Sequence, residues 1–153
     1  MDLEELYQEV ILDHSRRPRN FGVLENPDVV VHGDNPACGD EIHLGVQFGP
    51  EGKLQQIKFS GQGCAISVAS ASMMTAKLKG KSRAEAKEMA CTFKNVVTGE
   101  GVDPSKSLGD LQLFQGVRKF PQRVKCAMLP WRALEQALAQ TGGEATITTE
   151  ADT

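Results

Sequence analysis

The chain has 153 residues, of which 40% are hydrophobic and 24% are charged, and its formal net charge at pH 7 is −3. This length suits a single domain with its own hydrophobic core, and the slightly acidic balance gives no general reason to expect nucleic acid or a membrane as a partner. No apolar run approaches the roughly 18 residues of a membrane span, and the acidic, amphipathic N-terminal segment is unlike a secretory signal peptide, so the sequence predicts a cytoplasmic protein.

The first predicted element is an amphipathic helix near the N-terminus. Its apolar residues recur at the i, i+3, i+4 spacing of one helix face: Leu3, Leu6, Tyr7, Val10 and Ile11. Pro18 ends this helix, and the segment RRPRN (16–20) is typical of an extended basic loop.

Three short strands are predicted next. Residues 28–32 are rich in β-branched side chains, and residues 41–48 alternate apolar side chains with polar ones or glycine. Residues 53–61 form a third strand after the GPEG turn at 49–52. Strands joined by such short connections form an antiparallel meander.

Helices are predicted for most of the remaining sequence. Residues 65–80 have a small-residue face and end at a glycine behind two lysines. Ser82 and Glu85 form a capping box that opens a second helix. Residues 108–121 indicate a turn or a short helix.

The last predicted helix runs from about Pro121 to Gly142. The fold class that follows is α+β: a three-stranded antiparallel sheet with helices packed on one face. Residues 1–143 are expected to form a single domain and residues 144–153 a flexible C-terminal tail. The structure of the 99–120 segment is left open.

Three of the four cysteines fall at the ends of predicted elements. Cys38 lies in the turn before the second strand, Cys64 opens a helix after the third strand, and Cys126 lies at the start of the last helix. Unpaired N–H groups at a helix N-terminus lower a thiol pKa, and the charges of Lys125 and Arg123 would act on Cys126 in the same direction.

These three thiols and Asp40 form a donor set that tetrahedral zinc accepts, and the same residues could hold an iron–sulfur cluster. The spacing is weak evidence, because the chain has no C-x-x-C motif. Ordinary free cysteines and a turn role for Asp40 are therefore alternatives. Cys91 lies in the middle of a predicted helix, and we expect it to pack in the core.

Four segments carry a resemblance to a known family. DHSRRPRNFG, NPACGDEIHL, FSGQGCAISVASASMM and RVKCAMLPWRALEQAL together resemble the NifU/IscU-like family of iron–sulfur cluster assembly proteins, in the order that the family has them. The likeness covers residues 4–140, nearly the whole chain. It implies the family's fold, with a metal site at one end of the sheet.

Two departures resemble the SufU-type branch of that family. Lys125 stands where the scaffold branch has a histidine, and the stretch between Cys64 and Cys126 is longer. The resemblance implies zinc held by four residues: Cys38, Asp40, Cys64 and Cys126.

The same branch implies a function. Cys38 would accept persulfide sulfur from a SufS-type cysteine desulfurase, after a partner histidine replaces it on the metal, and the sulfur would pass to downstream iron–sulfur scaffold proteins. This activity is that of a sulfurtransferase-like partner rather than of a stand-alone enzyme. The basic loop with Arg16, Arg17 and Arg19 would dock the desulfurase, and Lys125 and Arg123 would support the site.

Two other functions stay open. The chain could be a scaffold on which a cluster is built, although Lys125 argues against it, or its zinc could be purely structural. Neither nucleic acid nor a membrane is expected as a partner. His14, His32 and His43 are interpreted as structural or solvent-facing residues rather than ligands.

Overall fold

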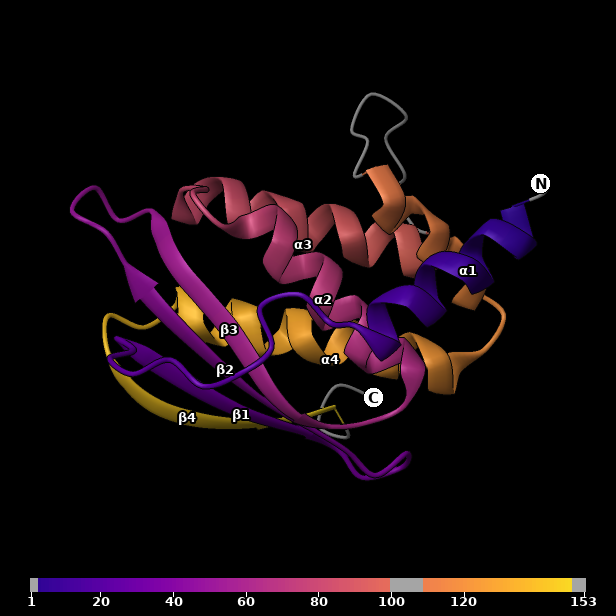
Figure 1. The fold of residues 1–153 in the computed structure, drawn as a ribbon, viewed down its shortest axis with the longest axis horizontal. Coiled ribbons are helices and arrows are strands. Elements are labelled where there is room, and N and C mark those ends of the chain that lie inside the picture. The colour runs from indigo at the N-terminus through magenta and orange to yellow at the C-terminus, as the bar shows by residue number, and fades with distance from the viewer. Residues whose placement is uncertain (1–2, 100–108, 150–153) are drawn as a thin grey trace.

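The computed structural model describes residues 3–99 and 109–149. Helices cover one face of a single sheet, and the other face of that sheet is open (Figure 1). The elements in chain order are α1 (Leu3–Arg16), β1 (Val29–Asn35), β2 (Asp40–Phe48), β3 (Leu54–Gln62), α2 (Ala65–Leu78), α3 (Arg83–Thr98), the 3-10 helix η1 (Gly109–Val117), α4 (Pro121–Leu138) and β4 (Gly143–Thr148). The α+β class with helices on one face is confirmed.

The sheet differs from the sequence expectation by one strand. Its order is β3-β2-β1-β4, in which β1, β2 and β3 form the predicted antiparallel meander and β4 pairs with β1 in parallel. The expectation of three strands, with a loose tail from residue 144, is therefore wrong for residues 144–148. Residues 150–153 lie outside the described residues, and the limits of a single domain at 1–143 remain a prediction.

The sequence did not predict β4 because the alternation of apolar and polar residues in this segment is short and weak. Ala145 and Ile147 alternate with polar residues, and only Ile147 is a large apolar side chain. It points toward Gly33 on β1, where a methyl group on the glycine would lie 3.1 Å from it. The strand forms because the free edge of β1 offers hydrogen-bond partners along its length.

The core lies between the sheet and the helices. Alternate residues of β1 and β2 face it, and the start of β2 contributes Asp40 on the same side as Leu44 and Val46. Trp131 of α4 is fully buried: its ring stacks on Phe93 at a centroid distance of 4.7 Å, and its N–H donates to Ser70 Oγ at 3.1 Å. Residues 69–72 of α2 are small and fully buried, and Ser70 among them bonds α4.

The helix boundaries follow local sequence signals. Ser82 and Glu85 form the predicted capping box at the start of α3. Pro121 occupies the first turn of α4, where its missing N–H costs nothing. That helix ends at Leu138, earlier than the predicted Gly142. The turn or short helix predicted for 108–121 is the 3-10 helix η1, whereas residues 100–108 of the 99–120 segment lie outside the described residues.

Cys91 corrects one expectation. It is exposed on α3 rather than packed in the core. The buried positions of this helix are Ala86, Ala90 and Phe93, followed by Val96 and Val97, and the next residue along from Ala90 lies about 100° around the helix axis. None of the helices in the described part of the chain is long and apolar enough to cross a membrane.

Candidate metal-binding site

Four residues from three separate segments of the sequence meet at one end of the sheet. Cys38 lies in the turn between β1 and β2, and Asp40 is the first residue of β2. Cys64 is the N-cap of α2, just after β3, and Cys126 lies in the second turn of α4. The metal site expected at one end of the sheet is placed where the strands β1, β2 and β3 and the helices α2 and α4 come together (Figure 1).

Short distances connect the four side chains. Ligand atoms of Cys38, Asp40 and Cys126 lie within 4.8 Å of one another. The Cys126 thiol donates to Cys38 Sγ at 3.3 Å, and the Cys64 thiol lies 3.6 Å from Asp40 Oδ2. Three of the four predicted ligands thus form one close group, and the fourth, Cys64, lies beside Asp40 at its edge.

The donor set fits zinc. Three sulfur atoms and one carboxylate oxygen match the preference of this ion for four soft or borderline ligands. Two sulfurs bound to one tetrahedral zinc lie about 3.8 Å apart, given Zn–S bonds of about 2.3 Å. The 3.3 Å between Cys38 and Cys126 is within 1 Å of that value, so small side-chain rotations suffice.

The position of Asp40 depends on a turn that the sequence analysis did not single out. Asp40 is 1% exposed, and its Oδ1 accepts a hydrogen bond from the backbone N–H of Cys64 at 2.8 Å. A methyl group on Gly63 would overlap Ser67 Oγ and lie 3.0 Å from Asp40 Oδ1. Gly61, with φ of +119°, has no room for a side chain against the Glu41 carbonyl. The signal in the sequence is the G-Q-G that precedes Cys64.

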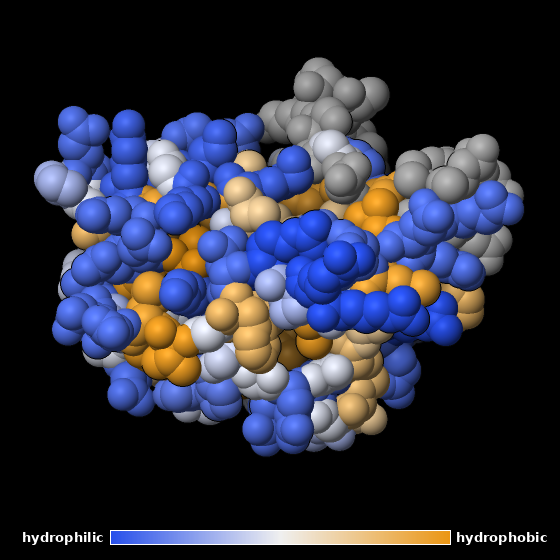
Figure 2. Space-filling view, viewed as in Figure 1, coloured by the Kyte–Doolittle hydropathy of each residue, from blue (hydrophilic) through white to orange (hydrophobic). Residues whose placement is uncertain are grey.

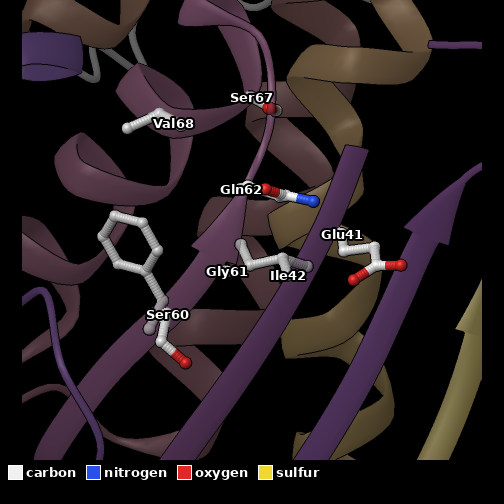
Figure 3. Close-up of a pocket in the computed structure, with 8 residues that line it drawn as sticks. Glu41, Ile42, Ser60, Gly61, Gln62, Ser67 and Val68 are labelled. Atoms are coloured by element: carbon white, nitrogen blue, oxygen red, sulfur yellow. The ribbon is translucent and has the colours of Figure 1, made fainter. Parts of the chain in front are cut away.

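Figure 3 shows the small hollow beside this turn, between the start of β2, the end of β3 and the start of α2. Glu41 and Ile42 line it from β2, Gly61 from β3, and Ser67 and Val68 from α2. Ser67 donates to the Cys64 carbonyl at 3.1 Å and lies 3.8 Å from the Cys64 sulfur. Ser67 therefore links the first turn of α2 to the thiol.

Gly63→Ala is expected to weaken metal binding by about 10-fold to 100-fold, the usual effect of disturbing the groups that orient a ligand. The added methyl group must push aside Ser67 or Asp40. A competition titration of zinc against a chelator measures the change. Gly45→Ala is the control, because Gly45, like Gly63, has no positive φ, but its added methyl group would make only ordinary contacts with Leu24, at 3.6 Å and beyond. Equal zinc affinity in the two variants would contradict the role of Gly63.

Three polar residues that the sequence analysis missed touch the thiols. Asn35, fully buried at the end of β1, donates from Nδ2 to Cys126 Sγ at 3.4 Å. The Cys38 thiol faces Gln122 Oε1 at 3.7 Å. Ser67, described above, is the third. Asn35 and Gln122 stand three and four residues before the cysteines Cys38 and Cys126, and this proximity in sequence is the only signal that could have found them.

The thiols of Cys64 and Cys126 are electrostatically unequal. A hydrogen bond from Cys126 and then others from Ser67 lower the pKa of Cys64 to about 6, against opposing effects of burial and Asp40. The same bond to Cys64, together with burial, raises the pKa of Cys126. The lowered pKa expected for Cys64 is confirmed in direction. The expectation for Cys126 is wrong, because this thiol is buried in the second turn of α4 and donates its proton.

In the metal-free protein, one thiolate is expected to form with a midpoint near pH 6. The pKa of Cys64 is lowered from 9.0 to about 6, so this group is ionised above pH 6 and neutral below it. The ultraviolet absorbance of thiolate, followed against pH, measures the step. Cys64→Ser should remove it and Cys91→Ser should not. A first step between pH 8 and 9 in the unaltered chain would contradict the assignment.

The two predicted supporting residues differ in position. Lys125 is half-buried and precedes Cys126, whereas the Arg123 guanidinium lies over the Phe120 ring at 4.6 Å. Arg123 also lines a hollow of about 530 Å³ with Tyr7, Arg118 and Lys119. Burial raises the pKa of Tyr7, while Arg123 lowers it and Cys64 raises it, so the phenol lies within electrostatic range of both.

Two of the three arginines in the basic loop after α1 form ion pairs within the chain. Figure 2 shows strongly hydrophilic side chains over the end of α1 and the loop that follows. Arg17 and Arg19 pair with Asp13 at 3.6 and 2.8 Å, and the Arg19 backbone N–H donates to Ser72 Oγ. Arg16, Arg17 and Arg19 are all exposed, and their role in docking stays a prediction.

A comparison with known families matches residues 6–127 to the family described as NifU-like N terminal domain. Among curated proteins, the chain is 46% identical to the zinc-dependent sulfurtransferase SufU of Bacillus subtilis (strain 168), over 93% of this chain and 95% of that protein. It is 45% identical to the iron-sulfur cluster assembly scaffold protein IscU of Streptococcus pyogenes serotype M1, over 91% of this chain and 86% of that protein.

A solved structure resembles the fold. The crystal structure of a protein described as an iron-sulfur cluster assembly scaffold for the SUF system, from Fervidobacterium islandicum AW-1, superposes with a TM-score of 0.81 at 40% identity. The match covers 88% of this chain and 98% of the other. The family resemblance predicted from the four segments is confirmed.

Proposed function

Because this chain belongs to the family of NifU-like N-terminal domains, we propose that it is an iron–sulfur cluster assembly protein that accepts sulfur at Cys38 and relays it toward cluster assembly. The observation that supports Cys38 as the sulfur acceptor is its exposure. Among the three clustered cysteines, Cys38 is exposed, Cys64 is half-buried and Cys126 is buried. Cys38 is therefore the most accessible of the three to a partner protein.

The sulfur donor in this proposal is a persulfide on a SufS-type cysteine desulfurase. The Cys38 thiolate attacks the outer sulfur of that persulfide, a new S–S bond forms at Cys38, and the old S–S bond breaks. The donor cysteine leaves as a thiolate and keeps the electron pair of the broken bond. No external oxidant or reductant is needed, since the sulfane sulfur only changes its partner.

Cys38, Asp40, Cys64 and Cys126 would hold zinc as the cofactor. When bound there, zinc stabilises the thiolate form of its cysteine ligands and has no redox chemistry of its own. The chain supplies the rest of the site: Asn35 donates to Cys126, and Ser67 approaches Cys64. Both contacts stabilise negative charge on sulfur.

The partners in this proposal are the desulfurase and, after transfer, an iron–sulfur scaffold protein in the cytoplasm. The exposed arginines at positions 16, 17 and 19, with Arg123 and Lys125, would favour an acidic surface on the desulfurase. Cys38 is exposed on the turn between β1 and β2, which gives it access to a docked donor.

A second candidate is a scaffold on which the cluster itself is assembled. Its support is the 45% identity to a relative named as an IscU scaffold, which is close to the 46% identity to the sulfurtransferase. The two candidates differ in what stays on the chain. A scaffold retains iron together with sulfide, whereas a sulfur acceptor carries sulfane sulfur on one cysteine.

The testing experiment is intact-mass analysis of the zinc-loaded protein after incubation with a SufS-type desulfurase and cysteine. The proposal predicts an added mass of one sulfur atom, mapped to Cys38. Zinc retained with no adduct would overturn it. Absorption spectra after addition of iron under reducing conditions test the scaffold candidate in the same preparation.

A further inference from the structure

Two of the three histidines of the chain face each other on the open side of the sheet. His32 of β1 and His43 of β2 are directly paired in the antiparallel register. Their ring centroids are 4.9 Å apart, and the two Nδ1 atoms approach to 2.6 Å. The third histidine, His14, is elsewhere and bonds Ser72 through its own Nδ1.

A carboxylate on the neighbouring strand orients this pair. Glu144 of β4 places Oε2 at 3.3 Å from His32 Nε2. A carboxylate accepts hydrogen bonds, so neutral His32 carries its proton on Nε2 and has a lone pair on Nδ1. The short contact between the rings then requires His43 to donate from Nδ1.

This arrangement resembles the outer shell of a metal site. Histidines that bind metals usually donate their other ring N–H to a carboxylate, which fixes the ring and increases the basicity of the ligating nitrogen. His32 already has that carboxylate, and its free lone pair points at His43. The three side chains come from the adjacent strands β2, β1 and β4, whose backbones hold them in register.

The geometry needs little change to admit an ion. Two imidazole nitrogens on one tetrahedral metal, at about 2.0–2.1 Å each, lie roughly 3.3 Å apart. The rings must therefore separate by less than 1 Å from their present 2.6 Å. The proton on His43 moves to its Nε2, and the second Nδ1 lone pair becomes available without any net change in charge.

We propose that His32 and His43 form a second, exchangeable site for a divalent transition metal such as Ni²⁺ or Zn²⁺, with Glu144 as its positioning residue. The ligands are imidazoles, which suit these ions, and water completes the coordination because the site is open: the His32 side chain is 38% exposed and that of Glu144 is 73% exposed. Such a site exchanges its ion faster than a buried thiolate site.

The second site is separate from the cysteine site, although both use β2. Asp40 and His43 are three residues apart on this strand, and side chains on a strand alternate between its faces. Asp40 therefore faces the helices and His43 faces the open side. Loss of either site leaves the ligands of the other in place.

The test uses the full chain with its cysteine site already loaded with zinc. Ni²⁺ is titrated by calorimetry and by NMR of the histidine rings, for the unaltered protein, His43→Ala, Glu144→Gln and the control Gln47→Ala on the same face of β2. We expect one additional Ni²⁺ in the unaltered protein and the control and none in His43→Ala. Glu144→Gln should keep the stoichiometry and weaken affinity about 10-fold to 100-fold.

The NMR spectrum of the unaltered protein shows which histidines bind Ni²⁺, without relying on the variants. Paramagnetic Ni²⁺ should broaden the ring signals of His32 and His43 and leave those of His14 sharp. Equal Ni²⁺ uptake by the unaltered protein and His43→Ala, or unaffected His32 and His43 signals, would overturn the proposal. Sulfur transfer to Cys38 is measured separately, so failure here is distinguishable from failure of the proposed function.

Discussion

Cys38→Ala is expected to abolish sulfur uptake from a SufS-type desulfurase while leaving the fold intact. Cys38 is exposed in the turn between β1 and β2, where substitutions usually change stability by no more than about 0.5 kcal/mol. Cys38 is, however, the most exposed of the clustered thiols, and in the proposed function it is the nucleophile. Mass spectrometry should show uptake at background level, and urea unfolding of the metal-free protein should show an almost unchanged midpoint.

Cys126→Ala is the matched comparison, because it removes the same atom from the buried end of the cluster. Cys126 is 2% exposed and accepts the hydrogen bond of the fully buried Asn35. Its loss leaves a cavity and an unpaired buried amide, each costing on the order of 1–3 kcal/mol. Cys91→Ala on the exposed face of α3 controls for loss of an unrelated thiol.

This pair of variants separates a sulfur acceptor from a purely structural zinc module. In a structural module, every ligand serves only to tether the chain, so Cys38→Ala and Cys126→Ala would reduce by similar amounts the extra stability that zinc gives over the metal-free form of the same variant. In a sulfur acceptor, Cys38 is dispensable for folding and indispensable for uptake. Retained uptake by Cys38→Ala would rule out its assignment as the sulfur acceptor.

The sequence was most informative where residue type is tied to one local structure. The capping box at Ser82, the alternation in residues 41–48 and the turn at 49–52 each specify backbone geometry over a few residues, and the structure has all of them. The cysteine segments were informative for a different reason: their amino-acid sequences are specific to a family, whereas the spacing of the cysteines alone favoured ordinary free cysteines over a metal site.

The features that the sequence did not predict depend on contacts between segments that are distant in the chain. β4 forms because β1 has a free edge, which no pattern within residues 143–148 encodes. The raised pKa of Cys126 arises from its burial and from Cys64, 62 positions earlier in the chain. Asn35 and Gln122 join the site through pairings of whole elements. The pairing of His32 with His43 likewise requires the register of β1 and β2, which periodicity predicts only to within a residue or two.

The packing of Trp131 connects the stability of the fold to the geometry of the site. Its N–H donates to Ser70 Oγ, and that hydroxyl in turn donates to the carbonyl of Ala127 at 2.6 Å, within one turn of Cys126. The indole also stacks on Phe93 of α3. One side chain therefore holds α4 against both α2 and α3, and α4 is the helix that carries Cys126.

Trp131→Ala is expected to destabilise the metal-free protein by about 3–5 kcal/mol, a large share of the 5–15 kcal/mol that a typical domain has. The melting temperature should fall on the order of 10 °C. Trp131→Phe, which keeps a ring against Phe93 but loses the N–H donor, should cost about 1 kcal/mol. Because α4 positions Cys126, zinc affinity should fall with Trp131→Ala and stay near its original value with Trp131→Phe. Chelator competition and thermal unfolding measure the two effects. If zinc affinity were unchanged in a destabilised Trp131→Ala, the site would be held by the β1–β2 turn and the start of α2 alone.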